Sequence, residues 1–166
     1  MFDLLEAYGK LTLELRTLVS LVLVGEGIAR EEVTRRARQI VPGQVRCAGF
    51  VQRDHLADYY ALAEGFVFPT HSDPWGLVVN EAMACGLPVI ASDAAGCVAD
   101  LIEDRWNGWV VRRGDVIQLA SAMEKLGRDQ DGRARMGNHS RQRILSYSPE
   151  ACAAGIAQAA RSVARP

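Results

Sequence analysis

The chain has 166 residues, a length that suits one domain with a sizeable hydrophobic core. Its hydrophobic content of 49% and its mean hydropathy near zero are typical of soluble globular proteins. The net charge of −1 gives no electrostatic reason to expect a nucleic-acid partner. The sequence has no apolar run near the ~18 residues of a membrane span and no signal peptide, so we expect a cytoplasmic protein.

The cysteines and histidines give no metal-site pattern. The four cysteines are far apart and form no CxxC pair, and the chain has three histidines. We therefore expect no metal and no cofactor. Most of the cysteines should be small buried hydrophobes in a reducing compartment; they are Cys47, Cys85, Cys97 and Cys152.

The first part of the chain alternates between helical and strand patterns. Apolar residues recur at steps of three and four from Leu4 to Leu18, which predicts an opening amphipathic helix. Short apolar runs at residues 20–24 and 45–50 predict two buried parallel strands. Between them, the spacing of apolar residues over 33–40 predicts a helix with arginines on its wet side.

The central part continues the same alternation. Asp54 is expected to cap a helix and Gly65 to end it, with four residues facing inward, namely Leu56, Tyr59, Tyr60 and Ala63. Residues 66–69 then predict a strand. A helix is expected from Leu77 to Gly86, followed by a buried strand over residues 88–92.

The last part is mainly helical. We expect a short helix near residues 98–102 and a strand at 109–111. Asp115 should cap a helix through Leu126, and an arginine-rich helix with a solvated face should cover residues 133–145. Ser148, followed by Pro149, is a strong start signal for a final Ala-rich helix.

Strands that alternate with helices predict an α/β fold, a doubly wound, Rossmann-like parallel sheet with helices on both faces. Such sheets bind ligands at the carboxyl ends of their strands. We expect one domain over residues 1–166, with C-terminal helices from about residue 115 onward.

The most informative stretch is residues 69–93, PTHSDPWGLVVNEAMACGLPVIASD. It places Asp73 and Glu81 on either side of a Pro74-Trp75-Gly76 turn that leads into a helix. The start of a helix offers unpaired N–H groups and a positive dipole end, which favour a phosphate. Carboxylates on both sides would hold sugar hydroxyls, so the pattern predicts a nucleotide-sugar pocket. Taken singly, each residue also fits an ordinary structural role, as a turn aspartate, a turn glycine and a solvated helix glutamate.

This stretch resembles the signature of the family-4 retaining glycosyltransferases of the GT-B fold, in which two acidic residues flank seven others. The likeness extends over nearly the whole chain, through the segments VLVGEG at 22–27, VRCAGFV at 45–51, DRWNGWVV at 104–111 and GD at 114–115. The resemblance implies the C-terminal, donor-binding half of a GT-B enzyme.

The resemblance also implies roles for individual residues. Glu81 would hold the nucleotide ribose and Asp73 would face the donor sugar, so we expect these two acids to be the catalytic pair. The expected site for the donor diphosphate and sugar consists of Pro74, Trp75, Gly76, Leu77 and Val78, although packing under the loop is the favoured role of Trp75. The expected nucleotide site consists of Gly25, Val51, Gln52, Arg53 and Glu81, with the base contacted mainly through backbone. The sequence does not distinguish among UDP, GDP and ADP as the nucleotide of the donor.

By resemblance, the full enzyme transfers a hexose from a nucleotide sugar to an acceptor hydroxyl with retention of configuration and without a metal. The acceptor would be a carbohydrate or a lipid-linked molecule bound by an N-terminal domain, and peripheral membrane association of the full-length enzyme stays open. In this family the domain begins with a strand and a loop that carry an Arg and a Lys for the diphosphate. Here Met1 begins in the following helix, so we expect a fragment that lacks the first, central strand and binds a nucleotide sugar weakly without turning it over alone.

One departure lies inside the motif, because the family usually has Glu where this chain has Asp73. The carboxylate of Asp lies about 1 Å nearer its backbone, and a shift of that size can cost about a hundredfold in rate. This favours an alternative hypothesis, a non-catalytic nucleotide-sugar module that acts with a separate N-terminal partner chain.

Two further alternatives change the chemistry. Gly25-Glu26-Gly27 follows a strand, but a dinucleotide fingerprint needs glycine where this chain has Arg30, which argues against NAD. A GT-B epimerase or phosphorylase keeps the fold. Phosphorylases of this fold hold pyridoxal on a lysine, and neither Lys10 nor Lys125 is near the motif.

Overall fold

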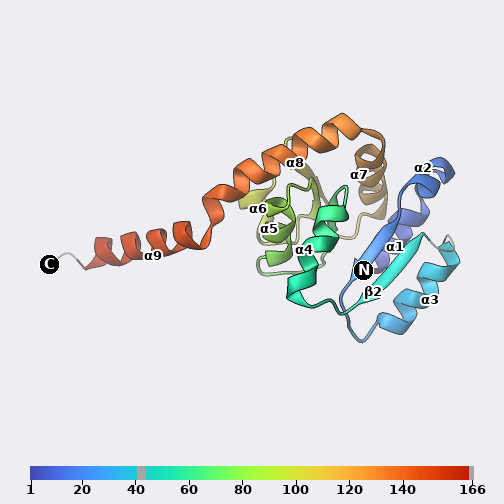
Figure 1. Ribbon diagram of the computed structural model, residues 1–166, viewed down its shortest axis with the longest axis horizontal. Helices are drawn as coiled ribbons and strands as arrows, with labels where there is room; N and C mark the ends of the chain where they lie inside the picture. Colours follow the sequence, from blue (N-terminus) through green and yellow to red (C-terminus); the bar gives the residue numbers. More distant parts are fainter. Residues whose placement is uncertain (41–43, 165–166) are drawn as a thin grey trace.

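The computed structural model describes residues 1–40 and 44–164. The helices and strands of these residues alternate from β1 to α7 (Figure 1). In chain order they are α1 Phe2–Gly9, α2 Leu13–Leu18, β1 Leu21–Val24, α3 Arg30–Ile40, β2 Val45–Gly49, α4 Arg53–Leu62, β3 Phe66–Phe68, α5 Leu77–Ala84, β4 Val89–Ser92, α6 Val98–Leu101, β5 Gly108–Val111, α7 Val116–Arg128, α8 Gln130–Ile144, the 3-10 turn η1 Leu145–Tyr147 and α9 Pro149–Val163.

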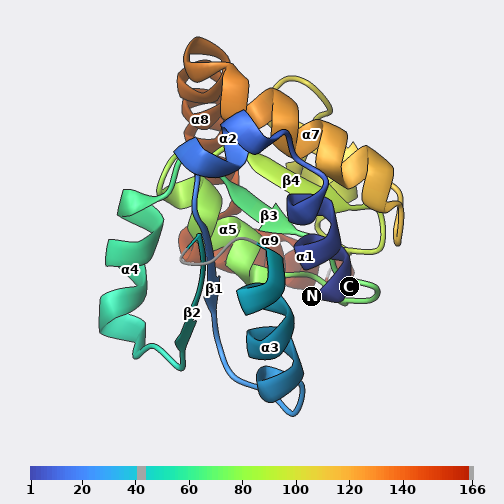
Figure 2. The same ribbon diagram turned by 90° about the vertical axis from the view of Figure 1, so that its right-hand side faces the viewer.

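All strand pairs are parallel, but the strands form two sheets rather than one. β1 pairs with β2, and β3, β4 and β5 form a second sheet with β4 in the middle. Within the described residues no strand pairs with the remaining edge of β1 or of β3 (Figure 2). The α/β class with parallel strands is confirmed, whereas the predicted single sheet is divided at the position where a central strand was expected.

The core follows the period-two alternation of a strand covered on both faces. All four residues of β4 are buried. Val89 and Ala91 face the cluster that contains Val79 and Met83 of α5. Ile90 points the other way, into the cluster formed with α1 and α7. Helices α5, α6 and α8 therefore lie on one face of this sheet, and α1 and α7 lie on the other.

The predicted opening helix is divided into α1 and α2. The periodic residues Leu4, Tyr8, Leu11 and Leu15 are buried as expected, but Leu18 is exposed. The break occurs at Thr12, whose hydroxyl accepts the Leu15 N–H and so caps α2. Thr12 has a non-helical ψ of 149°, because a capping residue leaves the helical conformation. The periodicity identified the buried face and missed the cap.

The sheet of β1 and β2 is much less buried than predicted. In β1 only Leu23 is buried, and Val22 is 45% exposed. Helix α4 buries none of its residues, so the expected inward face is wrong for Tyr59 and Ala63, which are exposed, while Leu56 and Tyr60 are half-buried. The caps of α4 also differ from the prediction. The N-cap is Gln52 rather than Asp54, and the helix ends at Leu62, before Gly65.

Helices α7 and α9 start where predicted, whereas α8 starts at Gln130, before its predicted range of 133–145. The Asp115 carboxylate accepts the Gln118 N–H, and the Ser148 hydroxyl accepts the Ala151 N–H. Helix α9 buries no residue and projects away from the body (Figure 1). The prediction of a solvated arginine face on α8 is wrong in part. Arg133 is only 16% exposed, because its guanidinium bonds to Glu64 and to the carbonyl of Leu126.

The cysteines are also less buried than expected. Cys97 is fully buried in the core beside α6, and burial raises the pKa of its thiol to about 11. Cys47 and Cys152 are exposed, and Cys85 is half-buried. The expectation of buried cysteines therefore holds for Cys97, and the exposure of Cys47 follows from the open sheet of β1 and β2.

Candidate functional site

The predicted turn and helix start are both present. Gly76 is the N-cap of α5 and has a φ of 95°, a left-handed conformation that favours glycine. A Cβ at this position would lie 2.8 Å from Cε1 of Phe68, so space also requires glycine. Leu77 and Val78 are exposed, and their N–H groups have no acceptor among the described residues. The start of α5 therefore presents free amides to solvent, as a phosphate site requires.

Asp73 holds the shape of the loop that precedes this turn. Its carboxylate oxygen Oδ1 accepts the N–H of Trp75 at 2.9 Å. Its backbone joins the segment after β4, because its N–H donates to the Ala94 carbonyl and its own carbonyl accepts the Gly96 N–H. Asp73 is half-buried. A two-residue turn of this kind is typical of Asp, and Oδ2 is left for other partners.

Trp75 packs beneath the loop. Its ring contacts the hydrophobic cluster of α5 and β4, and its Nε1–H donates to Asn80 Oδ1 at 3.0 Å. Its carbonyl accepts the Cys97 N–H. The backbone of Gly96 lies so close to the Pro74 carbonyl that a Cβ at 96 would overlap it. The favoured packing role of Trp75 agrees with these contacts, and Pro74 itself is exposed.

Glu81 lies one helical turn beyond Leu77 on α5, and its carboxylate is held from α4. Glu81 Oε2 accepts the hydroxyl of Tyr60 at 3.0 Å. Burial, followed by the hydrogen bond to Glu81, raises the pKa of Tyr60, so its hydroxyl keeps its proton. Glu81 is exposed and points toward α4, the helix that directly follows residues 51–52.

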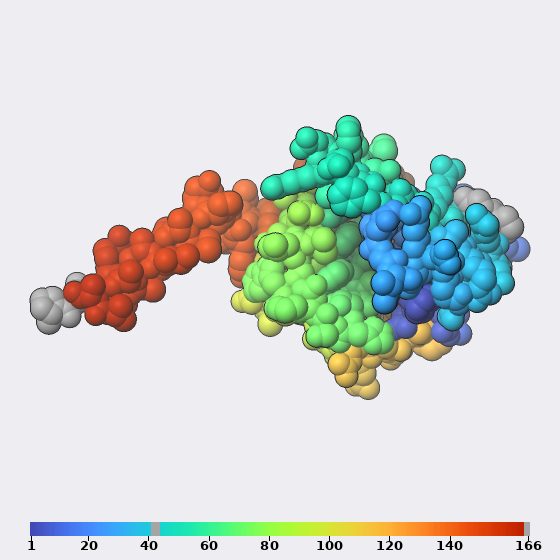
Figure 3. Space-filling model, turned by 90° about the horizontal axis from the view of Figure 1, so that it is seen from below, coloured from blue at the N-terminus to red at the C-terminus, as the bar shows by residue number. Residues whose placement is uncertain are grey.

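Two loops at the carboxyl ends of strands carry expected nucleotide residues. Gly25 ends β1 in a left-handed conformation with a φ of 126°, and its N–H donates to the Gly49 carbonyl. Residues 51–52 connect β2 to α4, with Gln52 and Arg53 exposed and Val51 half-buried. Figure 3 shows a hollow between the blue segment after β1 and the green segment that leads into α5, with α4 in teal beside it. The segment after β1, the segment that leads into α5 and helix α4 therefore border the same hollow.

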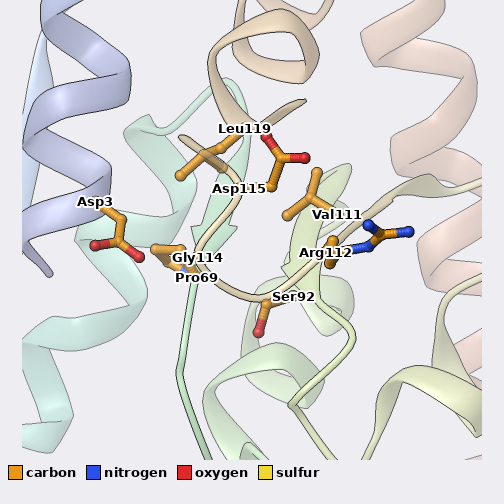
Figure 4. A pocket seen from close by; sticks show the side chains of 8 residues that line it. All are labelled: Asp3, Pro69, Ser92, Val111, Arg112, Gly114, Asp115 and Leu119. Atoms are coloured by element: carbon orange, nitrogen blue, oxygen red, sulfur yellow. The ribbon is translucent and has the colours of Figure 1, made fainter. Parts of the chain in front are cut away.

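A separate small recess lies at the ends of β3, β4 and β5. Its lining includes Asp3, Ser92 and Asp115, and it has room for little more than a water molecule (Figure 4). Nearby, His71 is exposed and its Nε2 lies 2.7 Å from Asp3 Oδ2, which ties the loop to α1. His71 is thus a surface histidine that links this loop to α1. Over the described ranges no group of three or more His, Cys, Asp or Glu residues is placed to hold a metal ion.

Sequence reasoning missed three residues that build this site. Tyr60 was expected to face the core, and its bond to Glu81 depends on how two helices pack. Asn80 and Gly96 support Trp75 and Pro74 through contacts between segments. The glycine at 96 was the only available signal, because a small residue after a buried strand often marks close backbone approach.

Comparison with known sequences identifies the family. A family described as "Glycosyl transferases group 1" matches residues 1–143. The chain belongs to this family. It is 36% identical over 101 residues to the sulfoquinovosyl transferase SQD2 of Arabidopsis thaliana, which covers 60% of this chain and 20% of that protein. It is 32% identical over 143 residues to the D-inositol 3-phosphate glycosyltransferase of Xylanimonas cellulosilytica, covering 83% of this chain and 34% of that one.

Solved structures of glycosyltransferases have the same fold. HepE of Anabaena in complex with UDP superposes with a TM-score of 0.82 over 98% of this chain and 45% of HepE, at 23% identity. The C-terminal domain of the group 1 protein LpcC from Francisella tularensis gives 0.78 over 87% of this chain and 76% of that domain, at 24% identity. The chain is thus a GT-B C-terminal domain, and it spans a fifth to a third of the length of the two sequence relatives above.

None of the helices in residues 1–40 and 44–164 combines the length and apolar character that a membrane crossing requires.

Proposed function

We propose that this group 1 glycosyltransferase domain binds the nucleoside diphosphate of a nucleotide sugar and that the whole enzyme transfers the sugar to an acceptor hydroxyl with retention of configuration. The observation that carries the proposal is the pairing of free amides at the start of α5 with the Glu81 carboxylate one turn later. The amides suit a diphosphate, and a carboxylate suits the two hydroxyls of a ribose.

In the proposed reaction, the bond between the anomeric carbon and the diphosphate oxygen breaks, and the diphosphate leaves with the electron pair. The acceptor oxygen forms the new bond, and its proton passes to an oxygen of the leaving diphosphate. Charge that develops on the leaving diphosphate is stabilised by the dipole and N–H groups of α5, which are already oriented before the reaction. Asp73 Oδ2 is the carboxylate oxygen available to the donor sugar. The acceptor, the identity of the sugar and the cytoplasmic location remain predictions.

HepE has been solved with UDP and also with UDP-glucose, which makes UDP the first nucleotide to test. Isothermal calorimetry should give heat with UDP, GDP or ADP and with the matching nucleotide sugar. Glu81→Gln should weaken nucleotide binding at least about tenfold, because a charge-assisted hydrogen bond contributes about 1.5–3 kcal/mol. Glu31→Gln, a change on the exposed surface of α3, is the matched control and should leave the affinity unchanged. Equal affinity of the Glu81 variant and the parent protein would contradict the proposal.

A non-catalytic module is the second candidate function, and the hydrogen bond between Asp73 and Trp75 favours it. An aspartate that holds the loop has one fewer oxygen for chemistry. A sugar-transfer assay with an N-terminal acceptor domain added in trans separates the two hypotheses. A non-catalytic module should bind the donor without restoring sugar transfer, whereas a glycosyltransferase domain should restore it.

A further inference from the structure

The Glu81 carboxylate is exposed and nevertheless has a defined partner. An exposed glutamate samples several rotamers, and fixing a long side chain costs up to about 2 kcal/mol of conformational entropy. The Tyr60 hydroxyl, at 3.0 Å from Oε2, selects one of these rotamers before any ligand arrives. Oε1 has no partner among the described residues and remains available to accept hydrogen bonds.

Tyr60 is itself fixed by aromatic packing. Its ring meets Phe66 edge to face, with centroids 5.9 Å apart and an angle of 66°. Phe66 stacks with Phe68 at 6.2 Å, and Phe68 lies directly beneath Gly76. Edge-to-face and offset rings in this distance range attract one another. The hydroxyl that holds Glu81 is therefore anchored to the same side chains that shape the turn at the start of α5.

The same hydrogen bond holds α4 in place. No residue of α4 is buried, and only Leu56 and Tyr60 are half-buried. Among the described residues, the bond from Tyr60 is the only side-chain hydrogen bond from α4 to another element. Helix α4 begins at Arg53, directly after the loop that is expected to meet the base. The position of that loop thus depends on an anchor about two turns along α4.

We propose that Tyr60 is a positioning residue for nucleotide binding: its hydroxyl orients the Glu81 carboxylate toward the ribose and docks α4, with its N-terminal loop, against α5. This inference rests on the proposed nucleotide function of Glu81. It predicts that recognition of the ribose hydroxyls, rather than of the phosphates, depends on one phenolic proton donor.

The binding test compares each nucleoside diphosphate with its 2′,3′-dideoxy analogue. The parent protein should prefer the nucleotide with both hydroxyls about tenfold. Tyr60→Phe keeps the ring and removes the hydroxyl, and it should reduce that preference at least threefold. Tyr59→Phe, on the neighbouring exposed residue of α4, is the matched control and should keep the full preference. A preference that Tyr60→Phe leaves intact overturns the positioning role.

The outcomes separate this inference from the proposed function. A parent protein that binds both analogues equally contradicts the ribose role of Glu81 and the orienting role of Tyr60 together. Docking of α4 is tested without ligand by hydrogen–deuterium exchange of residues 53–62. Tyr60→Phe and Glu81→Ala, which remove the donor and the acceptor of this bond, should each speed this exchange, and the double variant should be no faster than either. Unchanged exchange in both single variants overturns the docking role.

Discussion

At the scale of single residues, the site depends on Gly76 for two separate reasons. The left-handed φ of 95° is costly for any residue with a Cβ, and the ring of Phe68 leaves no space for that atom. Gly114 also has a positive φ of 76° but has open space around its Cα. Alanine substitutions at the two glycines therefore distinguish the backbone cost from the packing cost of adding a Cβ.

Gly76→Ala should lower the free energy of unfolding by about 2–4 kcal/mol, because the backbone cost and the overlap with Phe68 add. Gly114→Ala should cost only about 1–2 kcal/mol from the backbone. Urea unfolding of both variants, followed by circular dichroism, measures the difference. Equal losses in the two variants would show that Phe68 moves aside without cost.

The residues of the turn were predictable because their signals are local. Asp73, Gly76 and Glu81 lie within nine residues, and the acid, the glycine and the helix period can be seen along the chain. Tyr60 was assigned to the core because an aromatic residue at helical spacing usually faces inward. Its partner is 21 positions away on another helix, and nothing in the local pattern specifies that contact.

At the scale of elements, the helices capped by Asp115 and Ser148 differ in how deeply they are buried. Asp115 and Ser148 each accept the N–H three residues further on. Helix α7 packs four residues into the core, whereas α9 buries none. A cap contributes to global stability only where its helix is part of the cooperative core.

Asp115→Ala should therefore lower the free energy of unfolding by about 1 kcal/mol, the usual cost of a lost N-cap. Ser148→Ala should change it by less than about 0.5 kcal/mol, since fraying of α9 does not expose the core. Chemical denaturation compares the two. A loss for Ser148→Ala as large as that for Asp115→Ala would show that α9 packs on the body in solution.

Element positions could largely be predicted from hydrophobic period and caps, because these signals lie within ten to fifteen residues. The division of the opening helix at Thr12 was missed, since leucine spacing continues through the break. The low burial of α4 and β1 was also missed. An apolar run shows that an element can be covered, but it does not show whether another element covers it.

At the scale of the whole molecule, the two sheets differ in how completely they are enclosed. β4 is buried in all four residues between helices on both faces, whereas β1 buries only Leu23. Local opening requires less free energy where fewer apolar contacts are lost. The sheet of β1 and β2 should therefore open more readily than the sheet of β3, β4 and β5.

Backbone amides of residues 21–24 and 45–49 should exchange with deuterium faster than those of residues 89–92, by at least about tenfold, in the ligand-free protein. Mass spectrometry of peptic fragments resolves these segments. Equal protection in the two sheets would indicate that β1 and β2 are covered as completely as β4. Bound nucleotide should slow exchange most at residues 51–53, where the proposed base loop begins.

The hydrogen bond from Trp75 gives the Asp73 carboxylate a structural role besides its proposed role at the donor sugar. Replacing Asp73 by alanine would disturb the loop as well as any contact with the sugar, so an inactive alanine variant would not by itself test the proposed role in sugar transfer. Asp73→Asn keeps an oxygen that can accept the Trp75 N–H but removes the negative charge. This substitution therefore tests the effect of the charge while the loop keeps its hydrogen bond.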